Sequence, residues 1–125
     1  DKGRTMATDR SGKDRPMHAR ARDSLSGLRQ GWRRERSVRT HVSLSVLACL
    51  LLLWAQPSAP LVLAVLMLLV LGLALELMNG ALETGLDKLH PMRDPEVGAA
   101  KDMASAAAFV VNVAAAAAFA AAMLL

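Results

Sequence analysis

Three long stretches without a charged side chain constrain what this chain can fold into. They cover residues 42–55, 61–75 and 103–125. The last stretch has 23 residues, which as a helix is about 34 Å long, enough to cross a hydrocarbon core of about 30 Å. The first two are shorter and need helical flanking residues to span. The pattern predicts an all-α membrane protein with three transmembrane helices.

Other protein classes fit the sequence poorly. A disulfide scaffold is excluded because Cys49 is the only cysteine. A structural zinc site has little support, since the three histidines are widely separated and have no cysteine partners. A soluble globule usually has more than 3% aromatic residues and a less segregated distribution of charge.

Prolines and caps set the expected helix boundaries. Pro57 and Pro60 form a tight uncharged turn that separates the first two spans. Asp94 followed by Pro95 predicts the start of the last helix. We expect a surface helix over about 21–34 and spans over about 36–55, 61–89 and 95–125. Arg39 and His41 are expected to reach the membrane interface from the first span.

The N-terminal part carries most of the positive charge. Residues 1–41 hold twelve cations and five acids, a net charge of +7. Residues 1–20 show no apolar periodicity, which indicates a disordered basic arm or sequence introduced by cloning, followed by one membrane domain over 21–125. The alternative interpretation is that this arm binds nucleic acid. It is disfavoured because no aromatic interleaving or known module accompanies the arginines, so no nucleic-acid partner is expected.

Residues 21–34 have the pattern of an amphipathic helix. Ala21, Leu25, Leu28 and Trp32 recur at helical spacing beside a stripe of arginines. Such a helix suits the bilayer interface, or alternatively the surface of a partner protein. Cations precede the first span and lie in the loop before the third, whereas the turn at 56–60 has none. The positive-inside rule therefore places the N-terminus on the cytoplasmic side.

Acidic side chains are expected to gather at that same membrane face. Glu76 lies fifteen residues after Leu61, which puts it about 8 Å inside the cytoplasmic boundary of the core. A carboxylate at that depth is costly and indicates a functional site. Asn79, Glu83 and Asp87 share one helix face with Glu76. These groups could serve a divalent cation held with phosphate oxygens, or pair with basic residues of a neighbouring helix.

Several motifs resemble those of the bacterial integral-membrane diacylglycerol kinase family. Residues 76–87 read E-L-M-N-G-A-L-E-T-G-L-D, similar to the family pattern E-x-x-N-x-A-[IL]-E-x-x-x-D. Residues 100–107 read A-K-D-M-A-S-A-A and resemble A-K-D-x-x-[SA]-[AG]-A. Residues 27–35 are similar to G-[LF]-x-x-[AG]-[WF]-x-x-E. The resemblance covers about residues 20–125.

This resemblance implies an ATP-dependent lipid kinase that assembles as a homotrimer in the bacterial inner membrane, with Mg²⁺ as cofactor and active sites shared between subunits. It also implies roles for single residues. Glu76 is similar to the family's catalytic base, and Glu35 and Glu83 to its magnesium ligands. The other implied site residues are Lys101, Asp102, Asp87 and Arg29 for the nucleotide and its phosphates, and Asn79 and Ser105 as supporting groups.

The lipid acceptor implied by the resemblance is diacylglycerol, which would become phosphatidic acid. The stretch from Glu35 to His41 is closer to the form found in undecaprenol kinases, so undecaprenol is the alternative acceptor. Outside this class, the intramembrane acids could belong to a small transporter or channel subunit, or the chain could be an anchor without chemistry. The alanine-rich last helix favours close helix packing, and Asn112 within it is expected to donate an interhelical hydrogen bond.

Overall fold

The structure is a computed structural model that describes residues 15–125. This part of the chain contains four helices. They are α1 (Met17–Arg34), α2 (Arg36–Ala55), α3 (Ala59–Leu89) and α4 (Pro95–Leu124). By length and composition α2, α3 and α4 can each cross a membrane, which confirms the predicted all-helical fold with three spans. Helix α1 begins at Met17 rather than near Ala21. The rest of the predicted basic arm, residues 1–14, lies outside the described residues.

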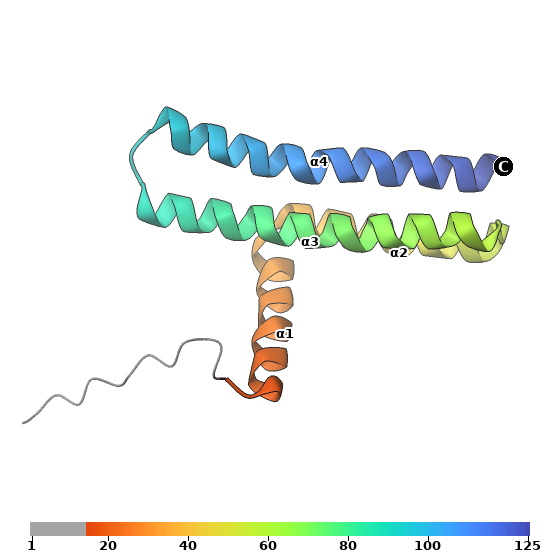
Figure 1. The fold of residues 1–125 in the computed structure, drawn as a ribbon, viewed down its shortest axis with the longest axis horizontal. Helices are drawn as coiled ribbons and strands as arrows, with labels where there is room; N and C mark the ends of the chain where they lie inside the picture. The colour runs from red at the N-terminus through yellow and green to blue at the C-terminus, as the bar shows by residue number, and fades with distance from the viewer. Residues whose placement is uncertain (1–14) are drawn as a thin grey trace, which may run out of the picture.

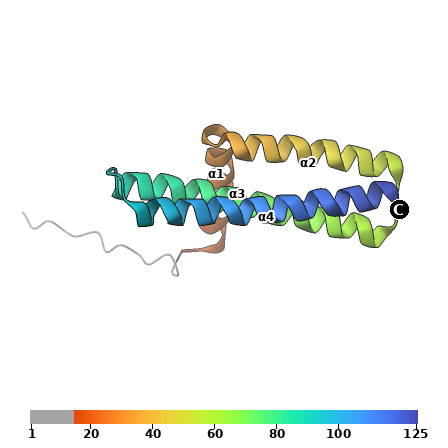
Figure 2. The same cartoon turned by 90° about the horizontal axis from the view of Figure 1, so that it is seen from above.

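Helices α3 and α4 form a long antiparallel pair (Figure 1). Helix α2 runs beside the half of this pair that carries the C-terminus, and α1 leaves the bundle across its long axis. The two views agree that α3 and α4 continue well past the point where α1 meets them (Figure 2). The bundle therefore has one end made of three helices and one end made only of α3 and α4.

Small residues allow α3 and α4 to pack closely, and these two helices have the most extensive contact in the fold. Ala108, Ala115 and Ala122 are buried at intervals of seven residues along α4. Gly72 and Gly80 are buried on α3. In a membrane, where helices gain little from leaving lipid, such close backbone approach supplies much of the packing energy.

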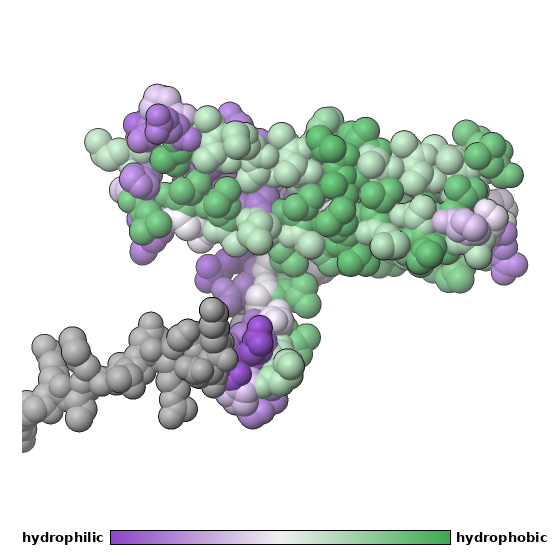
Figure 3. Space-filling model, in the orientation of Figure 1, coloured by the Kyte–Doolittle hydropathy of each residue, from purple (hydrophilic) through white to green (hydrophobic). Residues whose placement is uncertain are grey.

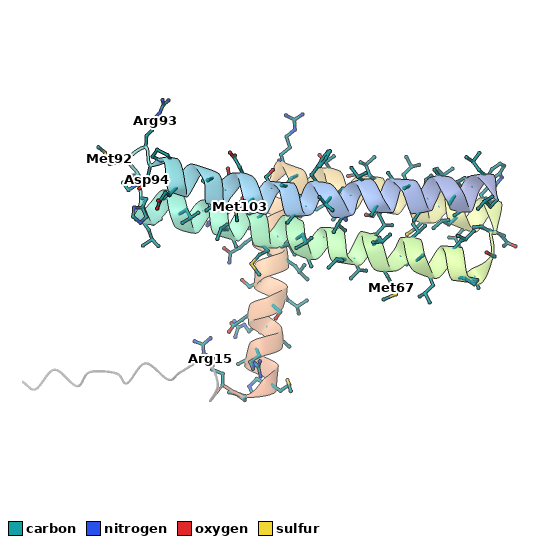
Figure 4. All side chains as sticks on the ribbon, turned by 45° about the horizontal axis from the view of Figure 1, so that its top comes forward. Arg15, Met67, Met92, Arg93, Asp94 and Met103 are labelled. Atoms are coloured by element: carbon teal, nitrogen blue, oxygen red, sulfur yellow. The ribbon has the colours of Figure 1, made fainter. Side chains whose placement is uncertain are left out.

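The apolar core lies at the three-helix end. Leu52 of α2, Val65 of α3 and Ala122 of α4 pack together there, and Val65 is fully buried. The outer surface over the three-helix end is predominantly hydrophobic, whereas hydrophilic residues gather on α1 and around the α3–α4 loop (Figure 3). Met92, Arg93 and Asp94 mark that loop in Figure 4. This division of the surface is the one expected for a helical hairpin that leaves the bilayer at one end.

The chain changes direction abruptly between α1 and α2. Glu35 is the single residue outside both helices, with an extended backbone at φ −100° and ψ 115°. The Arg39 guanidinium donates hydrogen bonds to the carbonyl oxygens of Trp32 and Arg33 at 3.0 and 3.1 Å. Arg39 thus satisfies carbonyls left open at the end of α1. That it reaches the membrane interface stays a prediction.

The other two connections follow the sequence closely. Gln56 ends α2 in the left-handed conformation (φ 46°), and Pro60 lies in the first turn of α3. The Asp94 carboxylate accepts hydrogen bonds from the backbone N–H groups of Glu96 and Val97, at 2.9 and 3.3 Å. The predicted N-cap of the last helix is therefore confirmed.

Candidate active site

The break between α1 and α2 places the Glu35 side chain against α3. A Cβ atom added to Gly80 would lie 2.8 Å from both Cγ and Cδ of Glu35 and 3.2 Å from its Oε1 atom. Contacts under 3.0 Å are closer than real Cβ atoms tolerate, so the approach depends on a residue without a side chain at position 80. Glu35 therefore rests on the α3 backbone at the point where Gly80 has no side chain.

Gly80 lies between two of the predicted site acids. Glu76 precedes it by four residues and Glu83 follows it by three, distances of about 6 Å and about 4.5 Å along the helix axis. Residues three and four apart share one face of a helix. Glu35 is thus brought to the acidic face of α3, about one turn from Glu83 along the helix axis. The pairing of Glu35 with Glu83 stays a prediction.

The carboxylates form an open arrangement. Within residues 15–125, no group of three His, Cys, Asp or Glu side chains is placed to enclose a metal ion. Two carboxylates on an open face nevertheless fit magnesium, which is commonly held by one or two carboxylates together with water and substrate phosphates. The donor set of Glu35 and Glu83 is therefore suited to a cation that arrives with a nucleotide.

Glu76 is the deepest of the acids. Its side chain is only 8% exposed, and its Oε1 atom accepts a hydrogen bond of 2.9 Å from the Nδ2 atom of Asn112 on α4. A buried carboxylate is costly unless it is hydrogen-bonded. This contact confirms the expectation that Asn112 donates between helices, and it identifies the acceptor.

Glu76 and Glu35 open onto different grooves. Glu76, Asn112 and His41 line a groove of about 630 Å³ between α2 and α4 whose wall is otherwise mostly apolar. Glu35 lines a groove of about 810 Å³ between α1 and α3. Glu35 and Glu76 therefore lie near the same stretch of α3 but line different grooves. An apolar groove with a few polar groups is typical of a site for an apolar ligand.

Lys101 joins α4 to the exposed end of α3. Its Nζ atom lies 2.7 Å from Oδ1 of Asp87 and 3.9 Å from Oε1 of Glu83. The structure thus brings Lys101, Asp87 and Glu83 together beyond the buried layer, as a mixed-charge cluster at the two-helix end of the bundle. Such a cluster can exchange an internal ion pair for contacts with phosphate oxygens.

The remaining predicted site residues are not brought together by this single chain. Arg29, Asp102 and Ser105 are exposed, and Asn79 is half-buried. None of these four side chains makes a hydrogen bond to another residue within 15–125.

His41 differs from its expected place. It was expected at the membrane interface, but it is only 8% exposed, and its Nε2 atom lies 2.8 Å from the carbonyl oxygen of Leu69. A carbonyl only accepts, so Nε2 carries the proton in this contact. The interfacial prediction is wrong because α2 packs on α3 at the height of Gly72, where the missing side chain leaves room for the imidazole ring.

The fold defines a helical membrane protein in which the buried acid Glu76 lines an apolar groove. Comparison with known families gives the particular family: the sequence profile of the prokaryotic diacylglycerol kinases matches residues 22–124. The chain belongs to this family, which supports lipid kinase activity. No curated protein matches the chain significantly.

Proposed function

We propose that this protein transfers the γ-phosphoryl group of ATP to the hydroxyl of a membrane lipid, converting diacylglycerol to phosphatidic acid. One observation carries the proposal. Glu76 is a buried carboxylate, held by a hydrogen bond, that opens onto an apolar groove. It lies about one helical turn from the point where Glu35 rests on α3.

Glu76 acts as the general base in this proposal. It accepts the proton of the lipid hydroxyl while the hydroxyl oxygen attacks the γ-phosphorus, and the bond to ADP breaks in line with the new bond. The apolar groove between α2 and α4 takes the lipid and keeps water from the base. Positioning and charge neutralisation then supply most of the rate enhancement.

Glu35 and Glu83 are the proposed ligands of Mg²⁺, which when bound neutralises phosphate charge. Glu35 rests against Gly80 of α3, and Glu83 follows Gly80 by three residues in that helix, an open arrangement that leaves coordination positions for phosphate oxygens. Lys101 supplies a further positive charge for the nucleotide, with Asp87 as its partner while no nucleotide is bound. Asp102, Arg29, Asn79 and Ser105 take the supporting roles that the family resemblance implies.

The test of the base is the Glu76→Gln variant. General-base catalysis contributes about 10²–10⁴-fold, so transfer of labelled phosphate from ATP to diacylglycerol in mixed micelles should fall by a factor in that range. Glu96→Gln, which changes an exposed acid in the first turn of α4, is the matched control and should keep wild-type turnover. Wild-type turnover in Glu76→Gln overturns the assignment.

The acceptor is tested in the same assay with undecaprenol in place of diacylglycerol. The similarity of residues 35–41 to undecaprenol kinases favours this second acceptor. We expect a higher kcat/KM with diacylglycerol. The opposite ratio makes the protein an undecaprenol kinase, and the absence of transfer to either lipid removes the kinase proposal.

We also propose a homotrimer in the bacterial cytoplasmic membrane, with the site on the cytoplasmic side. The family resemblance supports the trimer, and the many cations before α2 and their absence from residues 56–60 support the orientation. A new cysteine at Ser58, in a Cys49→Ser background, should react with an impermeant reagent from outside the cell. Reaction only after lysis reverses the orientation.

A further inference from the structure

The hydrogen bond between Asn112 and Glu76 is the one hydrogen bond that links the proposed base to α4 within residues 15–125. Nδ2 of Asn112 lies 2.9 Å from Oε1 of Glu76, and the two residues are 36 positions apart in the chain. An ionised carboxylate only accepts, so the amide nitrogen faces it and the amide oxygen faces away. A single directed bond therefore fixes one of the two carboxylate oxygens of Glu76.

Gly72 leaves room on α3 for the amide oxygen of Asn112. A Cβ atom at position 72 would lie 2.8 Å from Oδ1 of Asn112 and 2.6 Å from Cε1 of His41. The amide oxygen thus lies over the bare backbone of α3, beside an imidazole that is itself bonded to the Leu69 carbonyl. Oδ1 is buried and has no hydrogen-bond partner within residues 15–125. A buried amide whose oxygen is left without a partner contributes little to stability, which points to a different role.

We propose that Asn112 is a positioning residue for the lipid kinase reaction. By holding Oε1 of Glu76, it leaves the other carboxylate oxygen free for the lipid hydroxyl in the groove between α2 and α4, which both residues line. A glutamate side chain has three rotatable bonds, and a misplacement of about 1 Å at a reacting group can cost about 10²-fold in rate. The inference rests on the proposed function, because it requires Glu76 to be the base.

The first test replaces Asn112 by leucine, which has a similar size and no hydrogen-bonding group. We expect kcat to fall by about 10- to 100-fold, while KM for ATP stays within about twofold, because Asn112 lines the lipid groove and is not among the groups proposed to bind the nucleotide. Val113→Ala, at the next and half-exposed position of α4, is the control and should keep wild-type kcat. Wild-type kcat in Asn112→Leu overturns the inference.

A double mutant separates positioning from a structural role. If Asn112 acts only through Glu76, adding Asn112→Leu to Glu76→Gln causes no further loss of turnover, whereas a general structural role gives multiplied losses and overturns the inference.

The outcomes distinguish this inference from the proposed function. Full activity of Glu76→Gln removes both, whereas loss in Glu76→Gln with no loss in Asn112→Leu removes only the positioning role. Should Asn112→Leu fail to fold, Asn112→Ala makes the same test, because it removes the amide without adding volume. It should lower kcat without changing KM for ATP. Val113→Ala again serves as the control.

Discussion

The two ends of the α3–α4 pair are built from the same kind of helix and packed by the same small residues, but they are joined differently. At the three-helix end, Leu52, Val65 and Ala122 pack without a polar atom. Toward the α3–α4 loop, the helices meet through the Glu76–Asn112 hydrogen bond and the Asp87–Lys101 ion pair. Buried polar contacts often stabilise less than apolar side chains of the same volume. The comparison indicates that the apolar end holds the fold and the polar end is kept for chemistry.

Among the variants that compare the two ends, a methyl group at Gly80 is expected to have the largest effect, and it falls on the polar end. The added Cβ in Gly80→Ala would lie 2.8 Å from Glu35, so the carboxylate must leave its place on α3. We expect the rate of phosphate transfer to fall by about tenfold or more, and the magnesium concentration that gives half of the maximal rate to rise. Initial rates across a magnesium titration measure both effects.

The matched control for that variant is Gly85→Ala. It lies in the same helix, and its Cβ would meet no atom within 4 Å. It should keep wild-type rates and gain about 0.4–1 kcal/mol of stability, because alanine restricts the unfolded chain. Equal rates in the two variants would contradict the role of the Glu35–Gly80 contact.

The apolar end should respond in stability and not in catalysis. Leu52→Ala removes most of a buried side chain and should cost about 2–5 kcal/mol of unfolding free energy. Below the unfolding transition, kcat should stay unchanged, because Leu52 does not line the groove between α2 and α4. Denaturant unfolding in micelles measures the first quantity, and Leu53→Ala, at the next and exposed position of α2, is the control. A loss of kcat in the folded Leu52→Ala protein would break the division between the two ends.

The smallest effect is expected at the Asp87–Lys101 ion pair. Asp87 is well exposed and Lys101 partly so. Removing the pair by Asp87→Asn should therefore change the unfolding free energy by less than about 1 kcal/mol. High salt should reduce the difference from the wild type, since exposed charges are screened. A larger, salt-insensitive loss would show that this pair holds the polar end together.

The sequence was sufficient to predict the helices. Uncharged stretches, the prolines of the turn and the Asp94 cap are local signals, and each helix boundary that they predicted lies close to the observed one. The acidic face of α3 was also predictable, because Glu76, Glu83 and Asp87 belong to one helix and their relation follows from its periodicity.

The contacts between helices were not predictable in the same way. Nothing local shows that Glu35 will rest on Gly80, or that His41 will turn inward over Gly72 to the Leu69 carbonyl. Both contacts depend on which glycine of α3 faces which neighbour, and that depends on how the helices pack. The division of Glu35 and Glu76 between two grooves has the same origin.

The single residue between α1 and α2 links membrane depth to chemistry. Glu35 has helix on both sides, so there is no slack chain to absorb a shift of α1. An amphipathic helix settles at a depth set by the lipids around it. If α1 lies in the bilayer interface as predicted, a change in its depth also moves the Glu35 carboxylate relative to α3, so the lipid composition of the leaflet would affect how the proposed site is assembled.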